Sequence, residues 1–191
     1  MRTVAASILL ALAIPAFGIP PVPRPTKEFT FVDPSGQQVL LSSLKGKVVL
    51  VQFLFTWCPH CQAFSKMLTT MQKDMTPKGV QFFGVAFDDN IVGSAATMYK
   101  QKYEVGFPIA FAEREQVLSY LGLSVMERMA VPQIVIIDKE GRIRAQSQPL
   151  GSAELQNDVN LRKWLPALAA EKPGAPASPL VPVPVAAAVG K

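Results

Sequence analysis

Short extended runs alternate with helical spacing through the middle of the chain. Residues Glu28–Val32 and Gln38–Leu41 flank turn-forming residues at positions 33–36, so they predict a β-hairpin. Residues Val48–Phe55 are apolar except Gln52. A near-continuous apolar run of this length is typical of a strand covered on both faces, as in a mixed or parallel sheet.

Helical spacing begins directly after that strand. From Pro59 to about Met75 the apolar side chains recur every three or four positions, at Phe64, Met67, Leu68, Met71 and Met75. This spacing predicts a helix that packs on the sheet. Pro59 suits the first turn, where the missing N–H of proline removes no helical hydrogen bond.

The rest of the pattern predicts further strands and helices. We expect strands at Val80–Phe87, Ile109–Phe111, Gln133–Ile137 and Arg142–Gln146, and helices at Ser94–Tyr103, Glu113–Leu121 and after Ser152. Pro166 interrupts the last helical pattern and predicts that this helix ends, kinks or restarts there. A strand–helix–strand crossover that leads into an antiparallel hairpin predicts an α/β sandwich with a mixed sheet.

Both ends of the chain differ from its middle. Residues 1–18 combine a positive Met1-Arg2, an apolar run and small residues near Gly18, as in a cleaved secretory signal peptide. An uncleaved anchor is the alternative, although the run is shorter than the roughly 20 residues that span a bilayer. We expect a proline-rich linker at 19–26, one folded domain at 27–170 and a disordered or polyproline-like Pro/Ala-rich tail at 171–191, with a docking segment as the alternative for the tail.

Composition argues against nucleic-acid binding and against a mainly structural role for the cysteines. The net charge of +5 comes from lysines and arginines that are scattered singly along the 191 residues, which disfavours a nucleic-acid partner. A domain of this size buries a core without disulfides, so we do not expect its two cysteines to serve chiefly stability. Export would place them where disulfides persist.

Both cysteines and the only histidine lie within four residues, as Cys58, His60 and Cys61. A zinc site takes four protein ligands, or three and a water, and these residues exhaust the soft ligands of the chain. We therefore expect no metal and no cofactor. Electron exchange remains the best interpretation of the motif.

The position of the motif favours thiol chemistry. Cys58 is expected just ahead of a helix, where unpaired N–H groups and the helix dipole stabilise a thiolate. Cys61, one turn inside, would be shielded and act as the resolving thiol, and Trp57 can cover the pair. Because a protonated His60 would stabilise the Cys58 anion, we expect a couple more oxidising than thioredoxin; the alternative for His60 is an ordinary exposed first-turn residue.

Several motifs together resemble a known family. These are FTWCPHC after KGKVVLVQF, Val131-Pro132 before a strand, and the hairpin sequence IDKEGRI. They resemble exported TlpA-like thioredoxin-fold proteins of the redoxin (AhpC/TSA-type) group over about residues 27–165. The resemblance implies a thioredoxin-like three-layer sandwich, with helices on both faces of a mixed central sheet and an N-terminal β-hairpin.

The resemblance also assigns residues around the cysteines. Pro132 would be a cis-proline that faces the pair, and Val131 would lend its backbone to a substrate, which Trp57 and Pro59 would also contact. From the residues alone, a trans proline that starts a strand is the alternative for Pro132.

The chain departs from the family at two positions where relatives often carry a buried acid, because Gln52 and Phe64 cannot titrate. Gln52 is most simply interpreted as a hydrogen-bonded buried amide. These departures weaken the resemblance to reductases, while CPHC and the Val-Pro loop resemble DsbA-type oxidases that have a helical insertion missing here.

The sequence thus predicts an exported thiol:disulfide oxidoreductase, periplasmic or secreted, monomeric and not inserted in the membrane after cleavage. Its Cys58/Cys61 couple would exchange electrons with thiols or disulfides of exported proteins and with a membrane or periplasmic redox partner. One alternative is a peroxiredoxin-like thiol peroxidase, although peroxiredoxins place threonine three residues before the cysteine, where this chain has Phe55. The other is a binding module that has kept the fold.

Overall fold

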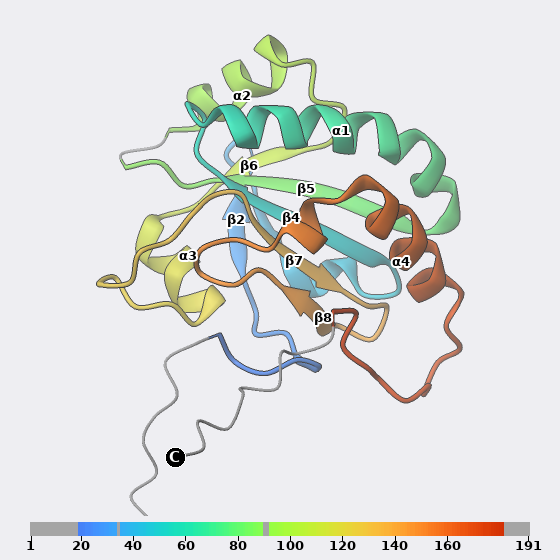
Figure 1. The fold of residues 1–191 in the computed structure, drawn as a ribbon. Helices are drawn as coiled ribbons and strands as arrows, with labels where there is room; N and C mark the ends of the chain where they lie inside the picture. Colours follow the sequence, from blue (N-terminus) through green and yellow to red (C-terminus); the bar gives the residue numbers. More distant parts are fainter. Residues whose placement is uncertain (1–18, 34, 90–91, 182–191) are drawn as a thin grey trace, which may run out of the picture.

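A computed structural model describes residues 19–33, 35–89 and 92–181 (Figure 1). The predicted signal peptide at 1–18 and the last ten residues of the predicted tail lie outside the described residues. Within the described part, one sheet has the strand order β1-β8-β7-β4-β5-β6-β2-β3. The strands are β1 (Arg24–Pro25), β2 (Thr30–Val32), β3 (Gln38–Leu40), β4 (Val48–Leu54), β5 (Val80–Ala86), β6 (Ile109–Phe111), β7 (Gln133–Ile137) and β8 (Arg142–Gln146).

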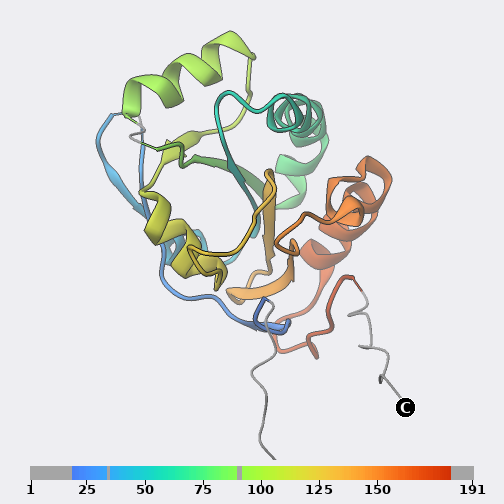
Figure 2. The ribbon, with the colours of Figure 1, turned by 60° about the vertical axis from the view of Figure 1, so that its left-hand side comes forward.

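Helices cover both faces of this sheet (Figures 1 and 2). They are α1 (Pro59–Met75), α2 (Gly93–Lys102), α3 (Arg114–Leu121) and α4 (Asp158–Ala170), with short 3₁₀ helices at Leu41–Leu44, Thr76–Lys78 and Ala153–Gln156. Buried side chains of α1, α2 and α4 form one core layer with the sheet. Those of α3 and of β2 form the second layer on the other face. The three-layer α/β sandwich predicted from the sequence is confirmed.

Strand β4 is the centre of the fold. It pairs in parallel with β5, which follows through α1, and antiparallel with β7. All seven of its residues are buried, with Leu50 and Leu54 in one core layer and Val51 and Phe53 in the other. The apolar run therefore forms a doubly covered strand, as predicted, and it delivers the cysteine motif to the edge where β4 ends. The predicted hairpin also forms, as antiparallel β2 and β3.

The sheet begins earlier than expected. In the predicted linker, Arg24 and Pro25 form β1 and pair antiparallel with Ile143 and Arg142 of β8. The N–H of Thr26 also donates to the carbonyl of Gly141 at 2.8 Å. The physical reason is that the outer edge of β8 has backbone N–H and C=O groups without partners in the rest of the sheet, and this segment supplies hydrogen bonds to them.

The first part of the predicted disordered tail is held in place, which corrects the expectation for residues 171–181. The N–H of Leu180 donates to the carbonyl of Arg144 at 3.1 Å, and the Arg144 guanidinium donates to the carbonyl of Ser178 at 2.8 Å. Proline could not donate the first of these hydrogen bonds because it has no backbone N–H, whereas Leu180 can. The described fold thus extends on both sides of the predicted 27–170 domain.

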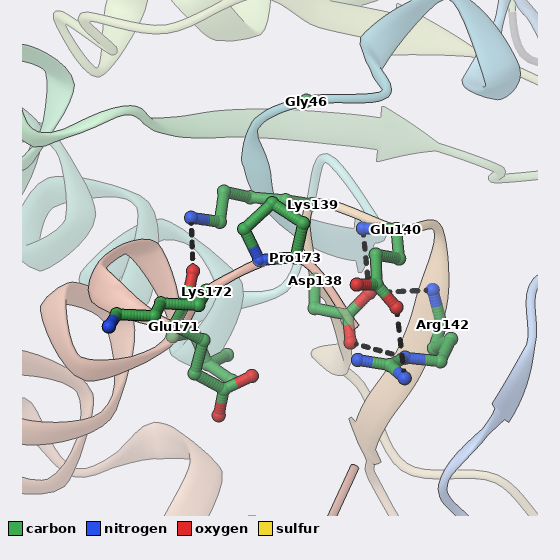
Figure 3. A pocket seen from close by; sticks show the side chains of 9 residues that line it. Gly46, Asp138, Lys139, Glu140, Arg142, Glu171, Lys172 and Pro173 are labelled. Carbon is green, nitrogen blue, oxygen red and sulfur yellow. Dashed lines mark hydrogen bonds and ion pairs between the residues drawn. The ribbon is translucent and has the colours of Figure 1, made fainter. Parts of the chain in front are cut away.

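Figure 3 shows the pocket of about 310 Å³ where this tail meets the turn between β7 and β8. Arg142 pairs with Asp138 at 2.8 Å and with Glu140 at 2.9 Å. The ammonium of Lys139 donates to the carbonyl of Glu171 at 2.6 Å, and the carboxylate of Glu171 pairs with Arg144. The acidic side chains around the pocket are paired within the protein. These ion pairs and the Lys139 hydrogen bond attach the tail to the turn between β7 and β8.

Helix α4 continues through Pro166 instead of ending or restarting there. Leu161, Leu165 and Leu168 are all buried on its inner face. This packing stabilises the helix although proline removes one backbone hydrogen bond. Among the described helices, none combines the length and the apolar character that crossing a membrane requires.

Candidate functional site

The cysteine motif forms the first turn of α1. Cys58 is the N-cap residue and Pro59 is the first helical residue, as the sequence predicted. The sulfur of Cys58 accepts the backbone N–H of Cys61 at 3.3 Å. Both thiols are free; the side chain of Cys58 is 6% exposed and that of Cys61 is fully buried. Both cysteines are therefore buried, and Cys58 is the one that keeps some exposure to solvent.

Different surroundings give the two thiols different chemistry. The sulfur of Cys58 faces the N–H groups and positive dipole end of α1, which stabilise an anion there. Burial raises the pKa of the Cys61 thiol, and its hydrogen bond with Cys58 raises it further. The two thiols therefore differ in their surroundings, and the raised pKa keeps Cys61 protonated near neutral pH.

The Val131–Pro132 peptide bond is cis and lies beside the cysteine pair. The carbonyl oxygen of Val131 is 3.8 Å from the sulfur of Cys58. Gln133, buried at the start of β7, donates through its amide to the carbonyl of Ala130 at 2.7 Å and to that of Gln148 at 3.1 Å. These contacts hold the loop that carries Val131 against the loop that follows β8.

The other predicted site residues lie near Cys58. Trp57 is 69% exposed, and its ring stacks on Phe55 with 5.3 Å between ring centroids. Pro59 and His60 are exposed in the first turn of α1. The structure thus brings Trp57, Pro59, His60 and Val131 together around Cys58.

A buried hydrogen-bonded chain runs beneath Cys61. The Gln52 amide donates to the carbonyl of Cys61 at 3.0 Å and accepts the Ser65 hydroxyl at 2.8 Å. The Ser65 and Tyr99 hydroxyls lie 2.8 Å apart. Burial raises the pKa of Tyr99, so every member of the chain is neutral at pH 7.

The interpretation of Gln52 as a hydrogen-bonded buried amide is therefore confirmed. Phe64, the other position without an acid, packs in the core. Sequence reasoning missed Ser65 and Tyr99. The signal for Ser65 was its place beside Phe64 and Leu68 on the apolar side of a predicted helix.

Two charged residues near the site were also missed. Asp88 follows β5, and its carboxylate accepts the backbone N–H of Thr56 at 2.9 Å and the Thr56 hydroxyl at 3.2 Å. The guanidinium of Arg114 lies over the Phe55 ring, 5.6 Å from its centroid. Because β4 and β5 are parallel, their carboxyl ends meet at one edge, and that rule could have placed Asp88 there.

The Thr56 hydroxyl is thus engaged with Asp88, and position 55 holds an aromatic ring. This arrangement gives no support to the peroxidase alternative. Among the described residues, no group of three or more His, Cys, Asp or Glu side chains is placed to hold a metal ion.

Known proteins resemble this chain in sequence and in fold. It is 26% identical over 118 residues to the thiol-disulfide oxidoreductase ResA of Bacillus anthracis, a match that covers 62% of this chain and 64% of that protein. It is 29% identical over 138 residues to the thiol:disulfide interchange protein DsbE of Pseudomonas aeruginosa, covering 72% of this chain and 66% of that one.

A solved structure from Chlorobium tepidum, described as a thiol:disulfide interchange protein of the thioredoxin family, has the same fold. Its TM-score is 0.63 at 23% identity, and the alignment covers 78% of this chain and 99% of that one. Residues 22–146, more than half of the chain, match the model of the AhpC/TSA family. The chain therefore belongs to the AhpC/TSA family and has a thioredoxin fold.

Proposed function

We propose that this protein is an exported thiol:disulfide oxidoreductase that uses the Cys58/Cys61 couple. One observation carries the proposal: the sulfur of Cys58 caps α1, lies 3.3 Å from the N–H of Cys61 and faces the carbonyl of Val131. A thiol at the helix N-terminus that keeps some exposure and a fully buried thiol one turn away suit two-step disulfide exchange. The names of the relatives from Bacillus and Pseudomonas support the same activity.

The exchange proceeds through a mixed disulfide. In the reducing direction the Cys58 thiolate attacks one sulfur of a substrate disulfide, whose other sulfur leaves as a thiolate and takes a proton. Cys61 then gives up its proton and attacks the Cys58 sulfur. The second substrate sulfur leaves, and a Cys58–Cys61 disulfide remains. Two electrons pass to the substrate, and a dithiol donor restores the reduced protein.

In the oxidising direction the same steps run in reverse, from the Cys58–Cys61 disulfide to a substrate dithiol. The chemistry needs no cofactor in either direction. The pattern at residues 1–18 supports export to the periplasm or the cell exterior. The partners we propose are thiols or disulfides of exported proteins and a membrane or periplasmic redox protein, with this chain acting as a monomer.

Replacing the resolving thiol tests the proposal. In the Cys61→Ala variant, Cys58 can attack a disulfide but the mixed disulfide cannot be resolved within the protein. We expect covalent adducts between Cys58 and a peptide with one disulfide, detected by intact mass and released by a reductant. The matched control, Cys58→Ser with Cys61→Ala, should form none.

The proposal fails if Cys61→Ala forms no adduct and the wild-type protein neither reduces nor oxidises the peptide. If peptide exchange is absent but peroxide is consumed with a thiol donor, the peroxidase alternative replaces it.

A further inference from the structure

A second pocket, of about 330 Å³, opens beside the cysteine motif. Its walls come from α1, through Pro59, Gln62 and Lys66, and from the end of α2, through Lys102, Tyr103 and Glu104. No residue in this set belongs to the motif except Pro59. The pocket is separate from the one in Figure 3, which lies at the turn between β7 and β8.

Helix geometry places the pocket along the first two turns of α1, which begins directly after Cys58. Residues 59, 62 and 66 lie on one face of α1, because positions three, four and seven apart are neighbours on a helix. Pro59 directly follows Cys58, so a chain bound at the Cys58 sulfur reaches the pocket within a few residues.

The charges of the pocket are available to a partner. Lys66 and Lys102 are both exposed, and within residues 19–33, 35–89 and 92–181 neither makes an ion pair with a carboxylate. The Lys102 ammonium lies 5.3 Å from the centroid of the Tyr103 ring, which holds it at the rim. Glu104 is the one acid among the lining residues. Two ammonium groups against one carboxylate favour an anionic guest.

We propose that this pocket selects substrate proteins that carry an acidic side chain close to their reactive cysteine. The carboxylate would lie between Lys66 and Lys102 while the substrate sulfur meets Cys58. This proposal rests on the proposed disulfide exchange, and it adds a substrate class to it.

Two peptides test this selection. Both contain one disulfide, and they differ only in Glu or Gln two residues after one cysteine. We expect the wild-type protein to reduce the Glu peptide with a kcat/KM about fivefold higher at low salt, and the ratio should approach one as salt screens the charges.

Variants that remove either the positive or the negative charge of the pocket sharpen the test. Replacing both lysines, Lys66→Gln with Lys102→Gln, should remove the preference for the Glu peptide, whereas Glu104→Gln should raise it about twofold. Lys163→Gln is the matched control, because Lys163 is exposed on α4 and far from the pocket. Its neighbour Arg162 pairs with Asp74, which lies about 22 Å along α1 from Pro59. That variant should keep the wild-type ratio.

Equal kcat/KM values for the two peptides in the wild-type protein would overturn the selection and leave the exchange activity standing. The same holds if Lys163→Gln lowers the ratio as much as the double variant does. If the protein neither reduces the two disulfide peptides nor oxidises their dithiol forms, the exchange activity itself is overturned, and the selection with it.

Discussion

The two cysteines have identical side chains, and their surroundings assign the roles. Cys58 is the N-cap of α1 and its sulfur accepts a backbone N–H, while Cys61 is fully buried and its pKa is raised by that burial. His60 lies between them, exposed to solvent. The direction of electron flow depends on the reduction potential of the couple, and that potential depends on how well the protein stabilises the Cys58 thiolate.

A prediction for His60 follows from that balance. We expect His60, when protonated, to stabilise the Cys58 thiolate, and a stabilised reduced form makes the disulfide a stronger oxidant. We expect a reduction potential above the value of about −270 mV typical of thioredoxin, and His60→Gln should lower it by roughly 10–20 mV. Equilibration with a glutathione redox buffer measures both.

Lys73→Gln is the control, because Lys73 is in the last turn of α1, about 21 Å along the helix from Pro59. This variant should leave the potential unchanged. A wild-type potential at or below about −270 mV that does not respond to His60→Gln would turn the assignment toward a reductase.

The elements around the site are joined by polar contacts as well as by apolar packing. Gln52 on β4, Ser65 on α1 and Tyr99 on α2 form one buried chain beneath Cys61. Asp88 after β5 fixes Thr56 in the loop after β4. Polar contacts from β4, α1, α2 and the segment after β5 thus meet around the cysteine motif.

Removing the centre of the buried chain should destabilise the protein. Gln52→Leu leaves the Cys61 carbonyl and the Ser65 hydroxyl with one partner fewer in the core. We expect the free energy of unfolding to fall by about 1–3 kcal/mol. Tyr99→Phe removes only the terminal hydroxyl and should cost about 0.5–1.5 kcal/mol. Urea unfolding measures both, and a Gln52→Leu variant as stable as the wild type would contradict the role of the chain.

At the scale of whole elements the sequence predicted most of the architecture. Val48–Phe55 and Pro59–Met75 were recognised within a residue or so, since a buried strand and an amphipathic helix each have a clear apolar period. Gln52 was recognised as a buried amide, but its partners Ser65 and Tyr99 were not. They lie 13 and 47 positions away, and only the packing of α1 and α2 brings them together.

At the scale of the whole molecule, both ends of the described chain cover the same edge of the sheet. The segment with β1 and the tail at 171–181 both lie against β8. Buried Arg144 joins this region, because it pairs with Asp138 at 3.2 Å and with Glu171 at 2.6 Å. Composition alone predicted a linker and a disordered tail here, because proline-rich segments supply few donors. The partners that order them belong to β8.

The pH dependence of stability tests this junction. Burial alone would raise the pKa of Asp138, but hydrogen bonds from Arg142 and Arg144 outweigh it and hold the pKa below its usual value. A depressed pKa contributes stability above the pKa of the unfolded chain, near 4, and that stability is lost as the pH falls through the folded value. We expect Asp138→Asn to lower the free energy of unfolding by roughly 2 kcal/mol at pH 7 and to flatten its loss below pH 4.

Denaturant unfolding at several pH values measures this loss. Asp74→Asn is the control, since Asp74 pairs with Arg162 at the surface and should change stability little. If Asp138→Asn and the wild type lose stability in parallel below pH 4, the ionised Asp138 does not stabilise the junction.

The sequence by itself determined the local elements and the chemical class of the motif. Apolar periods define strands and helices locally, and two cysteines one helical turn apart permit few kinds of chemistry. Tertiary structure alone decided which other distant residues meet, such as Tyr99 beside Ser65 and Lys102 across a pocket from Lys66. The physical reason is that such contacts depend on how sheet order and helix packing place segments far apart in the chain, which no local period encodes.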